Sequence, residues 1–189
     1  MRFLSMLLLL GACGSVSLST IVQLSRLDPL TANPDGFVAA IALPDALDIP
    51  EGGATLGFFW AYAGTTIGGT YTLQRQAGVG PAPADGQHVL VFDLTPTDAA
   101  SIRQTQQQII ALKADGVAGE GTFSVYAIPC AHGEVATPRL STYIQVEADG
   151  AFLPLLRDYD ISADMALGQL PACIYALARA GVVALNRRG

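Results

Sequence analysis

The sequence predicts a mainly β protein, an antiparallel β-sandwich with one crossover α-helix. Short segments in which apolar and polar residues alternate recur along the chain, separated by turn residues such as Gly, Pro, Asn and Asp. This pattern is typical of strands with one buried face. A single longer segment, 96–115, instead has apolar residues at helical spacing. Because no internal repeat or low-complexity block interrupts residues 20–173, we expect a single domain there.

Two apolar runs predict strands in the amino-terminal half, and the first of them is predicted to be buried. Residues 37–43 are continuously apolar and end at Pro44, and residues 88–94 are apolar on nearly both faces. Strands that are covered on both sides have this composition. Residues 20–27 fit a strand or a helical turn, and periodicity does not decide between the two.

A hairpin is predicted between these two runs. In residues 54–62 the large side chains recur at every second position, which places them on one face of a strand. They are Leu56, Phe58, Trp60 and Tyr62. Residues 64–69 form the predicted turn, and residues 70–75 return as a half-exposed strand. Trp60 is the only Trp of the chain, and we expect it in the core.

The predicted helix at 96–115 has recognisable ends. Thr95 with Asp98 approximates a capping box, and Pro96 suits the first helical position. Gly116 suits a left-handed carboxyl-terminal cap. The apolar stripe of the helix consists of Ala99, Ile102, Ile109 and Leu112. The polar side chains that point elsewhere are Arg103, Gln106, Gln107 and Lys113. We expect the Gln residues to be solvated, with a recognition strip for a partner as the alternative.

Three further strands are predicted after the helix, at residues 121–129, 140–148 and 151–159. Asp149-Gly150 predicts a type I′ hairpin turn between the last two. Pro154 cannot donate a ladder hydrogen bond, which favours a sheet edge for the last strand. Seven or eight strands with one helix before the last three resemble immunoglobulin-like or transthyretin-like sandwiches in element order.

The amino terminus carries the parts of a secretory signal peptide. Residues 1–12 combine Arg2, an apolar stretch too short to span a bilayer, and small residues before a cysteine. The sequence Leu10-Gly11-Ala12-Cys13 resembles the lipobox of bacterial lipoproteins, in which the cysteine sulfur takes a diacylglycerol before the new amino terminus is acylated. The resemblance implies lipid attachment at Cys13 and a tether over residues 13–19. Gly14 resembles the sorting context of outer-membrane lipoproteins that face the periplasm.

The net charge of the chain indicates which classes of macromolecule it can bind. Removal of Arg2 with the signal peptide leaves 9 basic and 16 acidic side chains, a net charge of −7. Such a chain repels phosphate backbones, so we expect no nucleic-acid partner. No basic patch for anionic lipid is present, and membrane attachment therefore rests on the amino-terminal lipid. The expected partners are the membrane, through that lipid, and another protein of the cell envelope.

Export also favours a disulfide between Cys130 and Cys173, the two remaining cysteines. The bond would need Cα atoms about 4.4–6.8 Å apart. It would close a loop of about 44 residues, which the chain-entropy model values at roughly 4 kcal/mol. A copper or zinc site on Cys130-Ala131-His132 is the competing interpretation. Because the chain has only two His and no further Cys/His cluster, we expect no metal and no cofactor.

Motifs for catalysis are missing from the sequence. It contains no Gly-x-Ser-x-Gly elbow, no His-Glu-x-x-His pair and no phosphate-binding Gly-rich loop. Asp158, Asp160 and Asp164 could hold a cation, but they lack the spacing of a calcium loop. We therefore expect a non-catalytic binding or assembly module for another envelope component. The alternative is an envelope hydrolase or a metal carrier using His88 or His132, which needs a carboxylate within hydrogen-bond reach of an imidazole.

The carboxyl-terminal tail, residues 174–189, differs from the rest of the chain because it contains no acid and three Arg. A terminal helix packed on the domain is the simplest interpretation. A segment on the membrane surface and a weakly ordered extension are the alternatives.

Overall fold

The computed structural model describes residues 29–136, 138–148, 150–163 and 170–173. Within them the fold is mainly β, with antiparallel strand pairs and a single α-helix, which confirms the predicted fold class. The choice between the immunoglobulin-like and transthyretin-like orders stays a prediction. The strands are β1 (Val38–Pro44), β2 (Leu47–Asp48), β3 (Ala54–Tyr62), β4 (Thr65–Thr72), β5 (Gln74–Gln76), β6 (Gln87–Asp93), β7 (Glu120–Ala127), β8 (Cys130–Ala131), β9 (Arg139–Gln145) and β10 (Leu153–Asp160). The α-helix is α2 (Pro96–Ala114), and two short 3-10 helices are η1 (Pro34–Gly36) and η2 (Ile161–Ala163).

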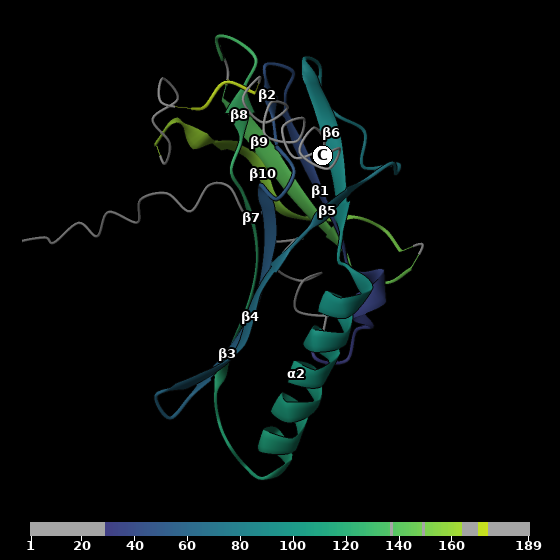
Figure 1. The fold of residues 1–189 in the computed structure, drawn as a ribbon, viewed down its shortest axis with the longest axis vertical. Helices are drawn as coiled ribbons and strands as arrows, with labels where there is room; N and C mark the ends of the chain where they lie inside the picture. Colours follow the sequence, from purple (N-terminus) through teal and green to yellow (C-terminus); the bar gives the residue numbers. More distant parts are fainter. Residues whose placement is uncertain (1–28, 137, 149, 164–169, 174–189) are drawn as a thin grey trace, which may run out of the picture.

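The strands form three sheets, in the orders β10-β9-β1-β6-β5, β4-β3-β7 and β2-β8. Strand β1 is the centre of the five-stranded sheet and is buried along most of its length, as its continuous apolar run predicts. Strand β10, which contains Pro154, lies at an edge of this sheet, and this confirms the prediction from proline. Figure 1 shows the three-stranded sheet extending away from the five-stranded sheet beside α2.

The connection between β3 and β4 is shorter than the sequence predicts. The turn consists of Ala63 and Gly64, whose φ angles are 45° and 78°, and β4 begins at Thr65. The prediction of a turn at 64–69 was therefore wrong. Gly68 lies within β4, where an added Cβ would come within 2.0 Å of the Phe58 carbonyl oxygen. Gly68 allows the backbones of β3 and β4 to approach each other closely. The sequence pattern does not distinguish a glycine with this role from a glycine in a turn.

The predicted strand at 70–75 is divided between two sheets. Strand β4 pairs with β3, whereas β5 pairs with β6. Leu73 lies between them, is 2% exposed, and donates its backbone N–H to the Ala54 carbonyl at 2.9 Å. The chain therefore crosses from the three-stranded to the five-stranded sheet at Leu73. This crossing creates the space that forms the candidate site.

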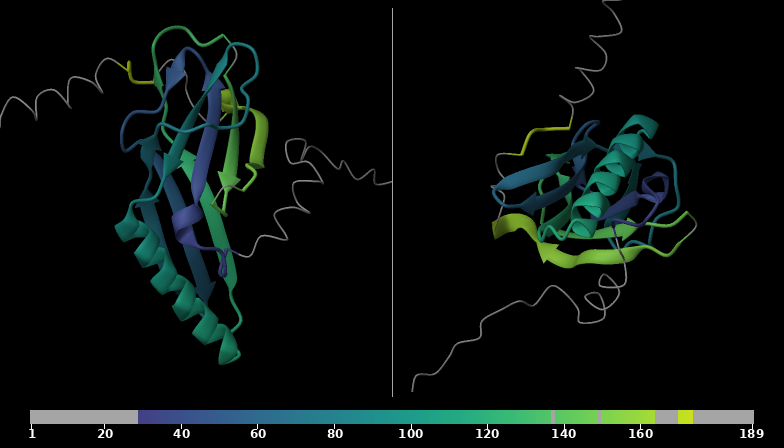
Figure 2. Two further views of the ribbon diagram at one scale, coloured as in Figure 1. Left: turned by 90° about the vertical axis from the view of Figure 1, so that its right-hand side faces the viewer. Right: turned by 90° about the horizontal axis from the view of Figure 1, so that it is seen from below.

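Helix α2 has the capping groups that the sequence predicts. The Thr95 hydroxyl oxygen accepts a hydrogen bond from the Asp98 backbone N–H at 3.0 Å, and its O–H donates to the Asp98 carboxylate at 2.8 Å. Gly116 follows the helix with a φ of 79°. Ala99, Ile102 and Ile109 of the predicted stripe are buried, while Leu112 is only half-buried. Figure 2 shows α2 along one side of the molecule, where it contacts β4 and η1.

Gln106 is the clear error in the helix prediction. Its side chain is 4% exposed, and its Nε2 donates to the carbonyl oxygens of Pro29 at 2.7 Å and Ala32 at 2.9 Å. The expected solvated face is covered here, because the segment that leads to η1 runs across it. Gln107 is exposed, as expected. A segment outside any helix or strand thus changed the environment of one helical position.

Side chains from both large sheets and from α2 form one continuous core. Trp60 is 7% exposed, which confirms its predicted burial, and the Lys113 ammonium lies 5.5 Å from the centroid of its ring. Phe37 and Phe123 meet edge to face with ring centroids 5.6 Å apart. Among the described residues, no helix is long and apolar enough to cross a membrane. The predictions for 20–27, for the turn at Asp149 and for the tail 174–189 fall outside the described residues.

Candidate functional site

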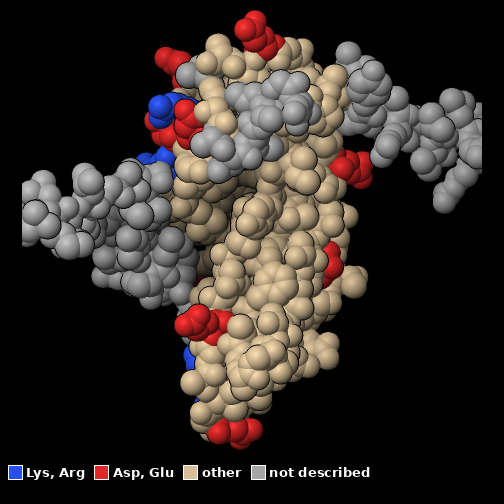
Figure 3. Space-filling view, turned by 90° about the vertical axis from the view of Figure 1, so that its left-hand side faces the viewer, with Lys and Arg blue, Asp and Glu red and all other residues tan. Residues whose placement is uncertain are grey.

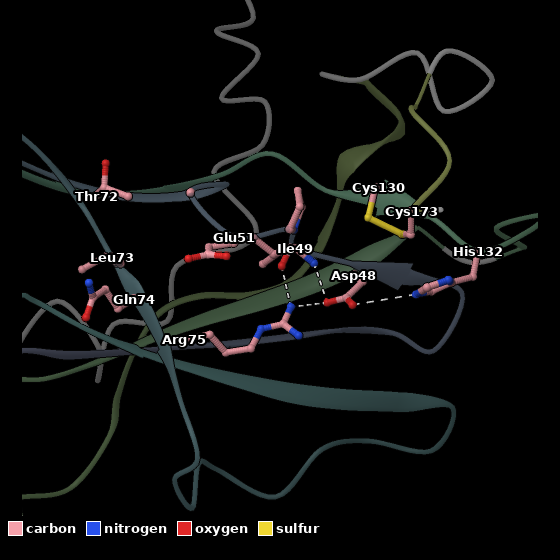
Figure 4. Close-up of a pocket in the computed structure, with 12 residues that line it drawn as sticks. Asp48, Ile49, Glu51, Thr72, Leu73, Gln74, Arg75, Cys130, His132 and Cys173 are labelled. Carbon is pink, nitrogen blue, oxygen red and sulfur yellow. Dashed lines mark hydrogen bonds and ion pairs between the residues drawn. A yellow bond between two sulfur atoms is a disulfide. The ribbon is translucent and has the colours of Figure 1, made fainter. Parts of the chain in front are cut away.

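A cavity of about 700 Å³ lies beside the crossing from β4 to β5. This volume is within the roughly 300–1,000 Å³ of small-molecule sites. Figure 4 shows side chains from β2, from β5 and from the loop after β8 around it. The lining residues are Asp48, Ile49, Pro50, Glu51, Gly52, Thr72, Leu73, Gln74, Arg75, Cys130, His132 and Cys173.

Among the carboxylates that line this cavity, Asp48 has the most hydrogen-bond partners. It accepts a hydrogen bond from the Ile49 backbone N–H at 2.7 Å and another from Nη2 of Arg75, which also donates to the Ile49 carbonyl. Burial raises the pKa of the Asp48 carboxyl. The hydrogen bonds from Arg75 and Ile49, with the charges of Arg75 and His88, outweigh burial and hold this pKa below 3.8. Asp48 is therefore an anion at neutral pH.

The fold brings both histidines of the chain towards this end of the domain. His132 Nε2 lies 3.8 Å from Asp48 Oδ2, and His88 Nδ1 lies 3.5 Å from Asp45 Oδ1. Both separations exceed the 2.7–3.2 Å of an N–H···O hydrogen bond. Each imidazole thus has a carboxylate neighbour without the contact that would orient it as a general base. The arrangement suits polar recognition better than proton transfer.

The predicted disulfide closes one side of the cavity. Cys130 and Cys173 are bonded, and their Cα atoms are 4.9 Å apart, inside the expected range. Two backbone hydrogen bonds reinforce the connection: Ala131 N–H donates to the Pro171 carbonyl, and Cys173 N–H donates to the Ala131 carbonyl. Residues 171–173 are thereby held against β8.

The acidic cluster considered for a cation has other partners. Asp158 Oδ2 pairs with Arg139 Nη1 at 2.9 Å, and Asp160 Oδ1 accepts a hydrogen bond from the Ser162 hydroxyl at 2.6 Å. Asp164 is outside the described residues, as is Cys13. Across the described part of the chain, no group of three or more His, Cys, Asp or Glu side chains is placed to hold a metal ion.

A second candidate site is the outer face of the β4-β3-β7 sheet, on the side opposite the core. Cross-strand register places its members in rows. They are Thr66, Gly68, Thr70 and Thr72 on β4; Thr55, Gly57, Phe59 and Ala61 on β3; and Thr122, Ser124 and Tyr126 on β7, with Ile128 just beyond. All are uncharged, and Tyr126 and Ile128 are 70% and 65% exposed. Figure 3 shows this uncharged expanse, with acidic groups at its margins.

This outer face is not among the sites that the sequence predicts. Its signal was present in residues 54–62, where the positions between the large side chains are small or apolar and not charged. A solvated strand face normally carries charged residues among its outward positions. An outward strand face without any charged residue is therefore the sequence signal of this surface.

Comparison with known proteins adds no relative to these observations. No protein-family model matches the chain, and neither a curated protein nor a solved structure is significantly similar to it. The function must therefore be argued from the chemistry of the two sites.

Proposed function

We propose that the chain is a lipid-anchored binding or assembly module of the bacterial cell envelope, attached through Cys13 and contacting another envelope component through the outer sheet face. The exposure of Tyr126 and Ile128 on an uncharged sheet face carries the proposal. Large exposed apolar side chains on such a patch mark interaction surfaces in soluble domains. Leu10-Gly11-Ala12-Cys13 supports the anchor, and the Cys130–Cys173 disulfide supports an oxidising compartment.

The outer membrane, with the domain facing the periplasm, is the proposed location, because Gly14 follows the acylated cysteine. The anchor is tested by membrane fractionation of a Gram-negative host that expresses the chain. The wild type should fractionate with membranes after processing, and Cys13→Ala should remain unprocessed. Normal processing of Cys13→Ala would refute lipidation.

The contact surface is tested in the same cells with a photo-crosslinking amino acid. Placed at Tyr126, it should form a discrete adduct with an envelope protein. Val79 is the matched control, because it is 94% exposed and apolar but lies in a loop outside the outer sheet face. Equal labelling from both positions, or none from Tyr126, would refute the outer sheet face as the binding surface.

The alternative, a hydrolase or metal carrier using His88 or His132, has weaker support from the geometry. His132 lies at the cavity, but Asp48 is committed to Arg75 and Ile49 and stays 3.8 Å from its imidazole. A general base needs a closer orienting contact. We therefore prefer the binding function to the catalytic alternative.

A further inference from the structure

We infer that the outer sheet face binds the same face of a second copy of this chain, so that two three-stranded sheets stack on one another. The inference rests on the proposed function, because it assigns a partner to the surface proposed there. Face-to-face stacking about 10 Å apart is how sheets bury their faces within single domains. Here the second sheet would come from another molecule.

Charge is the first argument for a second copy. The chain has 16 acidic and 10 basic side chains, so two copies repel each other over most of their surfaces. The outer sheet face carries a single charged residue, Glu120, which lies at the far end of the register. Two copies can therefore meet here without opposing like charges over the contact.

Shape is the second argument. Tyr126 and Ile128 project at one end of the outer sheet face, whereas Thr66 and Ala61 leave the opposite end low, and Phe59 lies half-buried between the two ends. A contact with two-fold symmetry joins the same patch on both molecules and requires that patch to be self-complementary. When the strands of the two copies run in opposite directions, the high end of each face meets the low end of the other. The Tyr126 hydroxyl then approaches the end that carries Glu120, a carboxylate able to accept its hydrogen bond.

The buried area of the proposed interface limits its affinity. Eight residues at a rise of about 3.3 Å and three strands spaced about 4.8 Å cover roughly 400 Å² of each copy. A pair would bury on the order of 800 Å², below the roughly 1,200 Å² of stable interfaces. We therefore expect a weak dimer, with a dissociation constant in the micromolar range or above. Anchoring both copies in one membrane raises their effective concentration and favours the pair.

Sedimentation equilibrium of the full chain in a density-matched nonionic detergent tests the inference, over about 1–300 µM protein. The wild type should change from monomer to dimer within this range. Tyr126→Asp and Thr122→Asp place a charge on the outer sheet face and should weaken dimerisation at least tenfold. Val79→Asp, a substitution at a still more exposed position elsewhere, should dimerise like the wild type. The emission of Trp60 reports whether each variant is folded.

The outcomes separate this inference from the proposed function. A wild type that remains monomeric at 300 µM overturns the inference. Dimers that persist in both outer-face variants also overturn it, because the contact must then lie elsewhere, for example at the outer strands β4 and β7 of the three-stranded sheet. If the purified chain is monomeric while Tyr126 still crosslinks to a different envelope protein in cells, the inference fails and the proposed function stands.

Discussion

Replacement of Gln106 by Ala should destabilise the domain by about 2 kcal/mol, although the substitution lies on the polar side of a helix. The Gln106 amide donates to two backbone carbonyls, those of Pro29 and Ala32. Loss of a partner costs about 1–3 kcal/mol for each buried polar group. Pro29 and Ala32 are half-buried, so water reaches their carbonyls in part and the low end of that range applies to each. The loss is a large share of a net stability of about 5–15 kcal/mol.

Urea unfolding followed by Trp60 fluorescence measures this loss directly, because Trp60 is the only Trp and lies in the core that α2 covers. Gln107→Ala is the matched control, since the same residue type is exposed one position later, and it should change stability by less than about 0.5 kcal/mol. Ile102→Ala, which removes a fully buried side chain of the same helix, should cost about 2–5 kcal/mol.

Gln106→Glu sharpens the test because it keeps the length of the side chain but replaces the donor by a carboxylate. At neutral pH the carboxylate faces two carbonyl oxygens, and the loss should exceed that of Gln106→Ala. Below about pH 4 the protonated acid regains one donor, and part of the loss should disappear. Equal and small effects at Gln106 and Gln107 would refute the argument that these hydrogen bonds hold the segment before η1 on the helix.

Three other substitutions test separate parts of the fold. Replacing both Cys130 and Cys173 by Ser should lower the free energy of unfolding by roughly 4 kcal/mol, measured in urea, and an unchanged midpoint would contradict a stabilising bond. Ala63→Gly should raise stability by about 0.5–1 kcal/mol, since Ala63 has a φ of 45° in the hairpin turn, and a lowered thermal midpoint would contradict that geometry. Asp48 has a lowered pKa, so its ion contributes stability above pH 3.8 that is lost as the pH falls below this value. Asp48→Asn should therefore be less stable than the wild type at pH 7, and the difference should shrink as the pH falls below 3.8. A constant difference would show that Arg75 does not act through the charge of Asp48.

Features that depend on neighbours in sequence could be predicted well. The ends of α2, the alternation in β3 and the edge position of β10 follow from capping groups, from a period of two and from Pro154. The Cys130–Cys173 bond followed from counting the cysteines of a chain whose amino terminus predicts export. Each of these is a local or compositional property, because backbone sterics and side-chain period act over a few residues. The lipid anchor at Cys13 is a prediction of the same kind.

The candidate sites depended on contacts between distant segments. Asp48, Arg75 and His132 are far apart in the chain. Arg75 reaches Asp48 because residues 65–76 divide between two sheets, and His132 lies near Asp48 because β2 pairs with β8. Gln106 is buried because residues 29–32 cross its helix, and nothing in the helix sequence records that crossing. The sequence alone therefore determined the fold class, the disulfide pair and the strand faces, since these follow from local period and composition. The tertiary structure decided where the chain changes sheets, which polar groups are enclosed and which sheet face the described residues leave uncovered. The free energy of burial depends on partners that sequence distance does not reveal.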